Sequence, residues 1–340
     1  MKSKIEIINT SKFIKLADFV FSAVVSEEDF NEKFKSNSLI IQKTELKSSN
    51  FIWFVVNNLK IKDNDVIFCH VELLKNLFSL LNSTNLKNLT LISAQSDKNI
   101  NQKIFSKKPE SIERWFSTNV IYKHESLYPI PLGVNNDFYS INLIEQDFKN
   151  FTFKQKEEKS NSIYSSFNVN TRFLHRHYAM KNAIKSKKIS FNQHKKNKKQ
   201  YLKQLNEHKY ILSPWGNGVD THRIWEALYA NCIPIVKDHV VFSSFRSLPI
   251  KFVKNYKNLD SNLNQSINDS EYLEIADFKY WESLILDSNS KDQEFDQNIF
   301  TINIEKLNSS FLKKRAVIIK FLVIKKKIKY FFYRLFKKIF

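Results

Sequence analysis

The residues best suited to chemistry lie in one stretch of the sequence, YILSPWGNGVDTHRIWEALYANCIPIV at 210–236. Gly216 and Gly218 flank Asn217 in this stretch. Glycine adopts positive φ readily and lets a ligand approach the bare backbone. A glycine loop that opens into a helix is suited to binding an anion, because the first N–H groups of the helix lack partners. The stretch therefore predicts an anion site around 216–218.

Two charged residues follow on the helix predicted at 220–231. Arg223 and Glu226 are three residues apart, so they share one face of that helix. An arginine near the helix start can hold a diphosphate through paired hydrogen bonds, and a glutamate one turn later can accept from a ribose diol. The alternative is a surface ion pair worth roughly 0.2–0.5 kcal/mol. The chain has 3 glycines where about two dozen would be usual, so the two glycines beside this helix favour the functional interpretation.

The elements that must position these residues alternate along the chain between strands and helices. Periodicity and Pro/Gly punctuation predict strands at 65–70, 88–97, 161–169, 208–214 and 232–237, and helices at 71–82, 110–120 and 220–231. Asp220 or Thr221 is suited to cap the N-terminus of the last helix, and Asn231 to follow its C-terminus. Such alternation predicts an α/β protein with parallel sheets covered by helices.

Two blocks of this kind flank a polar stretch at 146–162, which reads as a linker. The sequence therefore predicts a Rossmann-like N-terminal domain at 1–150 and a Rossmann-like C-terminal domain at 160–300. A separate basic tail is predicted at 311–340.

Most of the net charge of +20 lies in that tail. Residues 313–340 hold 11 Lys and Arg with no acidic residue, which leaves +9 for the first 312 residues. The apolar residues recur at helical spacing, at Ile328, Phe331, Phe332, Leu335, Phe336 and Ile339. A basic amphipathic helix with aromatic anchors is typical of proteins that lie on an anionic membrane surface. The alternative is a terminal helix docked on the protein's own core, with its basic face in water.

The first 21 residues lack the pattern of a signal peptide, so we expect a cytoplasmic protein, peripherally associated with the membrane through 313–340. Lys outnumbers Arg strongly, and no zinc-finger or RNP-type motif is present, so no nucleic-acid partner is expected.

The segment SPWGNGVDTHRIWEALYANCIPIV resembles the C-terminal signature of exostosin-like glycosyltransferases, especially small bacterial and viral members and the ribitol-phosphate xylosyltransferases. LISAQSD, IERWFSTNV and YPIPLGV resemble landmarks of the family's N-terminal domain, in the family's order. FRSLPIKFVKNY at 245–256 is similar to its L-P-x-x-x-V segment, but has Lys254 and Asn255 where the family has acidic residues. The resemblance covers roughly 65–256 and implies a GT-B fold, in which two Rossmann-like domains face a cleft.

The resemblance also implies a reaction: transfer of a hexosyl or pentosyl group from a nucleotide sugar to a glycan or lipid-linked acceptor, as in the synthesis of a surface polysaccharide. The glycine loop would approach the diphosphate, Arg223 would neutralise it and Glu226 would hold the ribose. The donor-binding residues implied are Gly216, Asn217, Gly218, Arg223, Glu226, Arg172 and Arg176. GT-B enzymes generally use no catalytic metal, so neither a metal nor another cofactor is expected.

An inverting transfer requires a base that removes the proton of the acceptor hydroxyl. Asp97, at the end of the strand predicted at 88–97, is the first candidate, and His70, at the end of the preceding strand, is the second. Asp97 could instead be a helix cap. The D-x-D triplet Asp63-Asn64-Asp65 precedes a strand and reads as a turn rather than a metal site.

Two alternatives remain beside this interpretation. One is a fucosyltransferase-like enzyme of the same fold. The other is a basic membrane- or nucleic-acid-binding module whose nucleotide site is degenerate.

Overall fold

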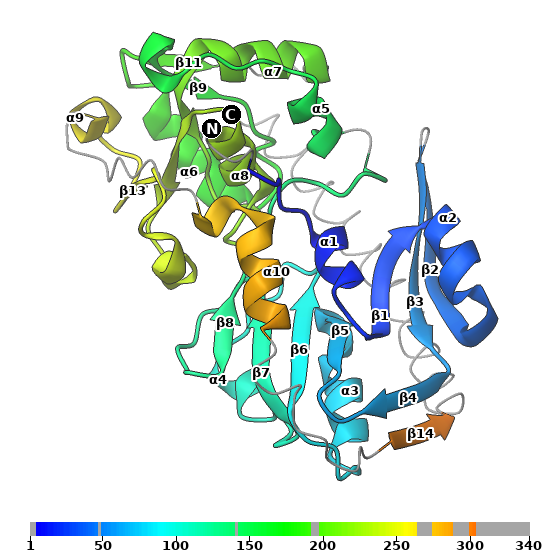
Figure 1. Ribbon diagram of the computed structural model, residues 1–340. Helices are drawn as coiled ribbons and strands as arrows, with labels where there is room; N and C mark the ends of the chain where they lie inside the picture. The colour runs from blue at the N-terminus through cyan, green and yellow to red at the C-terminus, as the bar shows by residue number, and fades with distance from the viewer. Residues whose placement is uncertain are drawn as a thin grey trace, which may run out of the picture.

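The computed structural model describes residues 5–46, 49–139, 142–191, 197–263, 274–287 and 299–303. In this part of the chain, two main sheets carry helices on their faces, and Figure 1 shows one sheet above the other. This arrangement confirms the prediction of an α/β protein with parallel sheets. The tail predicted at 311–340 lies outside the described residues.

The N-terminal sheet has seven strands in the order β2-β3-β1-β5-β6-β7-β8. Neighbours from β1 through β8 run parallel, whereas β3 is antiparallel to both β1 and β2. The strands are β1 (Phe19–Ser26), β2 (Ser38–Leu46), β3 (Ser49–Val56), β5 (Val66–His70), β6 (Leu89–Ala94), β7 (Ile112–Ser117) and β8 (Leu127–Pro129). The helices of this half are α1 (Thr10–Lys15), α2 (Glu27–Asp29), η1 (Phe30–Phe34), η2 (Lys35–Asn37), η3 (Val71–Leu73), α3 (Leu74–Leu81) and α4 (Gln102–Phe105).

The C-terminal sheet has five parallel strands in the order β10-β9-β11-β12-β13. Its strands are β9 (Ser160–Ser165), β10 (Ile189–Phe191), β11 (His208–Leu212), β12 (Ile233–Lys237) and β13 (Lys251–Val253). The helices before and around it are α5 (Glu145–Lys149), η4 (Lys156–Glu158), α6 (Phe173–Ala183), α7 (Lys198–Glu207), α8 (His222–Tyr229), η5 (Val240–Phe245) and α9 (Leu259–Leu263).

Alternate residues of each strand point to opposite faces of the C-terminal sheet, and both faces are buried. One face packs against α6, through Ile163, Tyr210, Leu212, Ile235, Ala179 and Ala183. The other face joins the large core that also contains the N-terminal sheet, through Tyr164, Ile211 and Val236.

The predicted strands at 65–70, 88–97, 161–169, 208–214 and 232–237 are confirmed, with shorter bounds, as β5, β6, β9, β11 and β12. The helix predicted at 110–120 is wrong, because Ile112–Ser117 forms strand β7 between β6 and β8. Trp115 and Phe116 are adjacent in the sequence and both fully buried, as in a strand covered on its two faces. Apolar spacing over so short a run does not separate such a strand from a helix.

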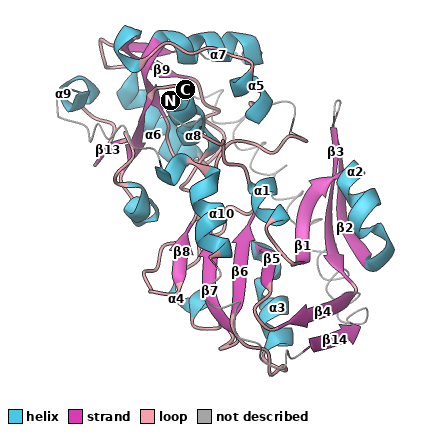
Figure 2. Cartoon of the chain, viewed as in Figure 1, coloured by secondary structure: helices cyan, strands magenta, loops and turns pink. Residues whose placement is uncertain are grey.

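The chain returns to the N-terminal sheet after the C-terminal one. Helix α10 (Phe278–Leu286), which follows η6 (Glu274–Ala276), lies against the N-terminal sheet (Figure 2). Arg114 of β7 donates from Nη1 to the Leu284 carbonyl and from Nη2 to the Ile285 carbonyl, each at 2.9 Å. Further on, β14 (Ile299–Asn303) pairs antiparallel with β4 (Asn58–Lys62).

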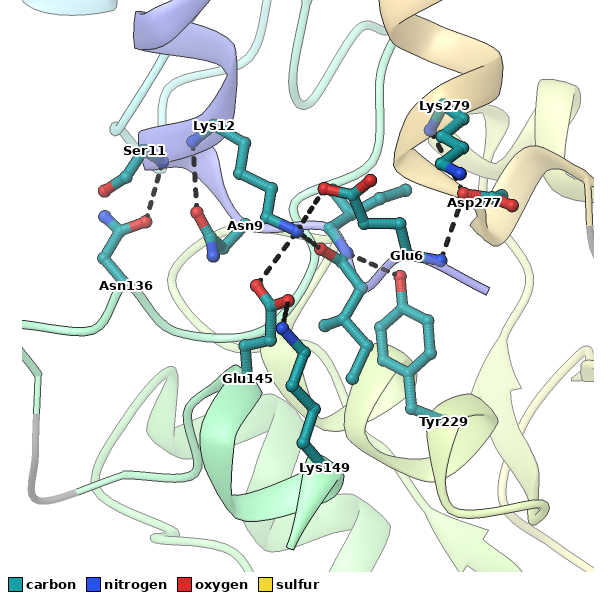
Figure 3. Close-up of polar contacts among 12 residues, drawn as sticks. Glu6, Asn9, Ser11, Lys12, Asn136, Glu145, Lys149, Tyr229, Asp277 and Lys279 are labelled. Atoms are coloured by element: carbon teal, nitrogen blue, oxygen red, sulfur yellow. Dashed lines mark hydrogen bonds and ion pairs between the residues drawn. The ribbon is translucent and has the colours of Figure 1, made fainter. Parts of the chain in front are cut away.

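A polar cluster ties the N-terminal segment to helices on either side of it (Figure 3). The ammonium group of Lys12 lies 2.8 Å from Glu6 Oε1 and 2.9 Å from Glu145 Oε2. The Tyr229 hydroxyl of α8 accepts a hydrogen bond from the Ile8 amide at 3.0 Å. These contacts bring α1, α5 and α8 together beside the edges of the two sheets.

Candidate functional site

The glycine loop connects the carboxyl end of β11 to α8, as the sequence predicts. The expected positive φ at Gly216 and Gly218 is wrong; Gly133 is the glycine with positive φ among the described residues, at +69°. The two loop glycines are needed for close approach instead. A Cβ on Gly216 would lie 3.2 Å from Arg176 Nη2, and one on Gly218 would lie 3.1 Å from Asp97 Oδ1. Side chains from both halves of the protein therefore pack directly on the backbone of this loop.

Arg176 of α6 holds the loop in place from the C-terminal half. Its Nε donates to the Trp215 carbonyl and its Nη1 to the Asn168 carbonyl, both at 2.9 Å. The side chain is buried, and this burial together with the nearby charge of Arg223 lowers the pKa of Arg176 to about 9. Its Nη2 donates to the Pro214 carbonyl at 3.5 Å, so all three nitrogens contact carbonyls and Arg176 acts first as a positioning residue for the loop.

Positive charge gathers around the Trp215 ring. The guanidinium carbon of Arg172 lies 5.2 Å from the ring centroid and the Lys237 ammonium 5.3 Å from it. The His175 ring stacks parallel to the indole with centroids 4.6 Å apart. Burial, followed by the charges of Arg172, Lys237 and Arg176, lowers the pKa of His175 to about 4, so this ring is neutral near pH 7.

Within the described part of the chain, no ion pair involves Arg172, Arg176, Arg223 or Lys237, although the Glu226 carboxylate feels the Arg223 charge at longer range. Four cations without an ion-pair partner among the described residues lie at the carboxyl ends of β9, β11 and β12 and create a site with positive potential. The potential favours a ligand with more than one negative charge.

Three buried polar atoms at the same edge of the sheet find no hydrogen-bond partner among the residues that the structure describes. They are Arg223 Nε, Thr221 Oγ1 and Ser165 Oγ. Thr221 stands at the N-cap of α8, as the sequence allowed, but its side chain makes no capping bond. Buried polar atoms in native proteins are nearly always satisfied, so these three atoms mark a place where a ligand group would complete the bonding.

Glu226 lies one turn beyond Arg223 and is buried. Its Oε2 accepts a hydrogen bond from the Tyr201 hydroxyl of α7 at 2.9 Å. Burial raises the pKa of Glu226, while the Arg223 charge and the Tyr201 bond act in the opposite direction. No ion pair joins Arg223 to Glu226 among the described residues, so the surface ion pair considered for this spacing is not present.

The N-terminal sheet reaches the loop through the segments that follow its parallel strands. Asp97, three residues beyond the end of β6 and exposed, accepts a hydrogen bond from the Gly218 amide at 3.1 Å. Asn119, which follows β7, accepts one from the Asp220 amide at 3.2 Å. The carboxyl ends of both sheets therefore face the same loop.

Asp220 is the most heavily bonded residue of this junction. Its Oδ2 accepts from the Leu132 amide at 2.9 Å and its Oδ1 from the Trp225 indole N–H at 2.8 Å. Burial raises the pKa of Asp220 to about 7 against the lowering effect of these bonds. Next to it, His222 Nδ1 donates to the Gly133 carbonyl at 2.8 Å. The YPIPLGV segment is thus bound directly to the start of α8.

The second base candidate, His70, lies within the N-terminal sheet. Its ring stacks on Trp53 with centroids 4.4 Å apart, and its Nδ1 accepts from the Glu72 amide at 3.3 Å. The triplet Asp63-Asn64-Asp65 forms the turn that the sequence predicts, with Asn64 at φ 67°.

The structure brings together most of the residues chosen from the sequence: Gly216, Asn217, Gly218, Arg172, Arg176, Arg223 and Asp97. Sequence reasoning missed Asn119 and the bridging role of Asp220. Asn119 carried a usable signal, because it ends the WFSTN landmark, three residues after the buried pair Trp115 and Phe116. Its partner is 101 positions away, and no local pattern indicates that distance.

The described residues contain neither the pattern of a metal site nor that of a membrane-spanning helix. No group of three or more His, Cys, Asp or Glu side chains in the described ranges is arranged to hold a metal ion. No helix in those ranges is both long enough and apolar enough to cross a bilayer.

A glycosyltransferase is the class of protein indicated by comparison with known families. Residues 160–274 match a family model described as the RXYLT1 C-terminal domain, that of the exostosin-like ribitol-phosphate xylosyltransferases. The match confirms the resemblance seen in the sequence: residues 160–274 are similar to the C-terminal domain of exostosin-like glycosyltransferases. The matched segment contains the whole five-stranded sheet and the glycine loop. No curated protein sequence matches the chain.

Proposed function

We propose that the protein is a GT-B glycosyltransferase that moves a hexosyl or pentosyl group from a nucleotide sugar to a glycan or lipid-linked acceptor, with inversion and without a metal. The observation that carries the proposal is the set of uncompensated cations beside the glycine loop, in the domain that matches the family. A nucleotide diphosphate supplies the two or three negative charges that this site lacks.

In the proposed complex the diphosphate lies against Gly216, Asn217 and Gly218, with Arg223 as its main charged partner. The unpaired Nε of Arg223 and the unpaired hydroxyl of Thr221 would donate to its oxygens. The N-terminal end of α8 adds a partial positive charge. These groups stabilise the diphosphate as it leaves, which is the role that a metal ion takes in other transferases. Glu226, held by Tyr201, is proposed to face the ribose.

The transfer itself needs one proton acceptor. The acceptor hydroxyl oxygen attacks the anomeric carbon, the bond from that carbon to the diphosphate breaks, and the hydroxyl proton passes to the base. Asp97 fits this role best, because it is exposed and adjoins the loop that would bind the donor. His70 remains the second candidate. The proposed setting is a cytoplasmic membrane face, reached through 313–340, where a surface polysaccharide is built.

The test is nucleotide binding by calorimetry, with UDP-, GDP-, CMP- and dTDP-sugars. One of the four should bind, and Arg223→Met should weaken it by about 10- to 100-fold through the loss of charge-assisted bonds. Arg246→Met is a matched control, because Arg246 forms an exposed ion pair with Asp238 outside the proposed site. Silence with all four donors would overturn the proposal and favour a module with a degenerate nucleotide site. Preference for GDP-fucose would favour the fucosyltransferase-like alternative.

The membrane part of the proposal is tested separately. Deleting 313–340 should release the protein from anionic vesicles while hydrolysis of the donor persists. Undiminished vesicle binding of the shortened chain would contradict the role of the tail.

A further inference from the structure

Helix α6 exposes an unusual combination of side chains. Leu174 is 83% exposed, Tyr178 39% and Ile184 56%, although large apolar residues on a surface helix normally face the core. Seven large apolar side chains are exposed in the described part of the chain, and these three fall within eleven residues. Exposed apolar side chains that cluster in this way mark an interaction surface.

The same helix turns small residues and an arginine inward. Ala179 and Ala183 are fully buried against the C-terminal sheet, and Arg176 is buried against the glycine loop. Leu174, Tyr178 and Lys181 follow one another at intervals of four and three residues, so they form one outward stripe, and the exposed Ile184 and Lys185 come directly after the last helical residue, Ala183. The helix therefore packs through its small residues and Arg176, and it leaves this stripe of apolar and basic side chains in solvent.

The surroundings of this stripe are strongly basic. From Lys159 to Asn206 the sequence holds twelve Lys and Arg and no Asp or Glu. Lys181, Lys185 and Lys187 are exposed, and none of them forms an ion pair within the described residues. Next to the end of α6, Asp260 of α9 accepts hydrogen bonds from the Ser186 hydroxyl and, at 3.1 Å, from the Lys187 amide.

We propose that the exposed face of α6 and of the turn after it, defined by Leu174, Tyr178, Lys181, Ile184 and Lys185, is a contact surface for an anionic lipid bilayer. Apolar side chains interleaved with uncompensated lysines match the two layers of such a surface, since the rings and aliphatic chains enter the interface and the ammonium groups meet lipid phosphates. This surface lies in the folded C-terminal half, so it is independent of the tail and of the donor assignment.

The first experiment places an environment-sensitive fluorophore on the full-length protein at Leu174→Cys. The native thiols Cys69 and Cys232 are buried, so the introduced one is the reactive thiol. Phosphatidylserine-containing vesicles should shift the emission to the blue and brighten it. The same label at Ile40→Cys, which is 47% exposed on β2, should not respond.

Three results would overturn the proposal: no response at position 174 while the protein sediments with the vesicles, an equal response to phosphatidylcholine alone, or a response to RNA but not to vesicles. The first result would assign vesicle binding to another part of the chain. The last would assign the surface to a nucleic acid.

The second experiment compares two pairs of lysine substitutions in vesicle partitioning. Lys181→Gln with Lys185→Gln should lower the partition coefficient roughly 25-fold, at about 1 kcal/mol per lysine. Lys103→Gln with Lys107→Gln removes two exposed charges near α4 of the N-terminal half and should have a much smaller effect. Both double variants should keep donor turnover, and equal losses of partitioning in the two would overturn the proposal.

Discussion

The Asp97 carboxylate accepts a hydrogen bond from the Gly218 amide at 3.1 Å, across 121 positions of sequence. A residue that follows a strand of the N-terminal sheet thus holds the loop of the matched glycosyltransferase domain. The residue proposed as the base is therefore also placed to position the loop that would bind the donor, and the two roles can be separated by substitution.

Asp97→Asn should abolish transfer while it preserves the loop. Its amide oxygen can still accept from the Gly218 amide, but it cannot take a proton, so transfer to the acceptor should fall by about 10²- to 10⁴-fold. Nucleotide affinity, measured by calorimetry, should be unchanged. Asp97→Ala removes both roles and should weaken nucleotide binding as well. Full turnover in Asp97→Asn would assign Asp97 to positioning alone.

Alanine at two of the glycines should affect different properties: stability at Gly133 and donor turnover at Gly218. A Cβ at Gly133 would lie 2.1 Å from the Ile8 carbonyl oxygen, in a residue with φ +69°. Gly133→Ala should therefore lower the free energy of unfolding by about 2 kcal/mol or more, measured in denaturant. The three atoms nearest to a Cβ at Gly218 are at the ends of the Asp97 and Asn119 side chains, at 3.1–3.3 Å.

Gly218→Ala should consequently cost less than about 1 kcal/mol of stability but reduce donor turnover, because Asp97 and the loop must separate. The pair of variants thus distinguishes a glycine required by the backbone from one required by its neighbours. Wild-type stability of Gly133→Ala would contradict this distinction, as would full turnover in Gly218→Ala.

Asp220 should give the stability of the protein a dependence on pH. Its pKa is about 7 in the folded state, against about 3.9 in an unfolded chain. The folded state therefore binds this proton more tightly, and the contribution is fully present below pH ~4 and is lost as pH rises to ~7. Asp220→Asn should remove this fall, by at most about 1.4 kcal/mol per pH unit, from the free energy of unfolding.

His175 provides an internal reference for that measurement. Its pKa of about 4 lies below the unfolded value of ~6.5, so its contribution is lost as pH falls through this range. The two residues act in opposite directions, and Asp220→Asn should therefore make stability increase more steeply from pH 4 to 6.5. The asparagine amide cannot replace both carboxylate oxygens, so the slope and not the absolute stability is the measurement. An unchanged slope would contradict the assignment.

The local architecture of the site follows from the sequence because its signals are local. Pro214 ends a strand, the glycines mark a loop, and Asn231 takes the positive φ, 55°, expected after a helix C-terminus. The parallel sheets follow from the alternation of strands and helices. The family resemblance likewise rests on residues that lie close together, and the matched segment contains them.

What the sequence does not predict depends on distant partners. Strand β7 is buried on both faces by elements far away in the chain, so its spacing alone resembles a helix. The bonds from Gly218 to Asp97 and from Asp220 to Asn119 span more than a hundred positions. The unsatisfied Arg223 Nε and Thr221 Oγ1 are visible only when burial is known. The amphipathic helix predicted at 313–340 lies outside the described residues and stays a prediction.

The return of the chain to the N-terminal sheet has a consequence for how the protein can be divided. Arg114 holds the last carbonyls of α10, and β4 pairs with β14, although both partners follow the matched segment that ends at 274. A fragment that ends before 274 would leave the N-terminal sheet without part of its own covering. The N-terminal half is therefore not a contiguous piece of the gene, whereas the donor-binding half is one internal stretch. Recombination between relatives that exchanges the donor-binding half would have to replace an internal insert rather than an end.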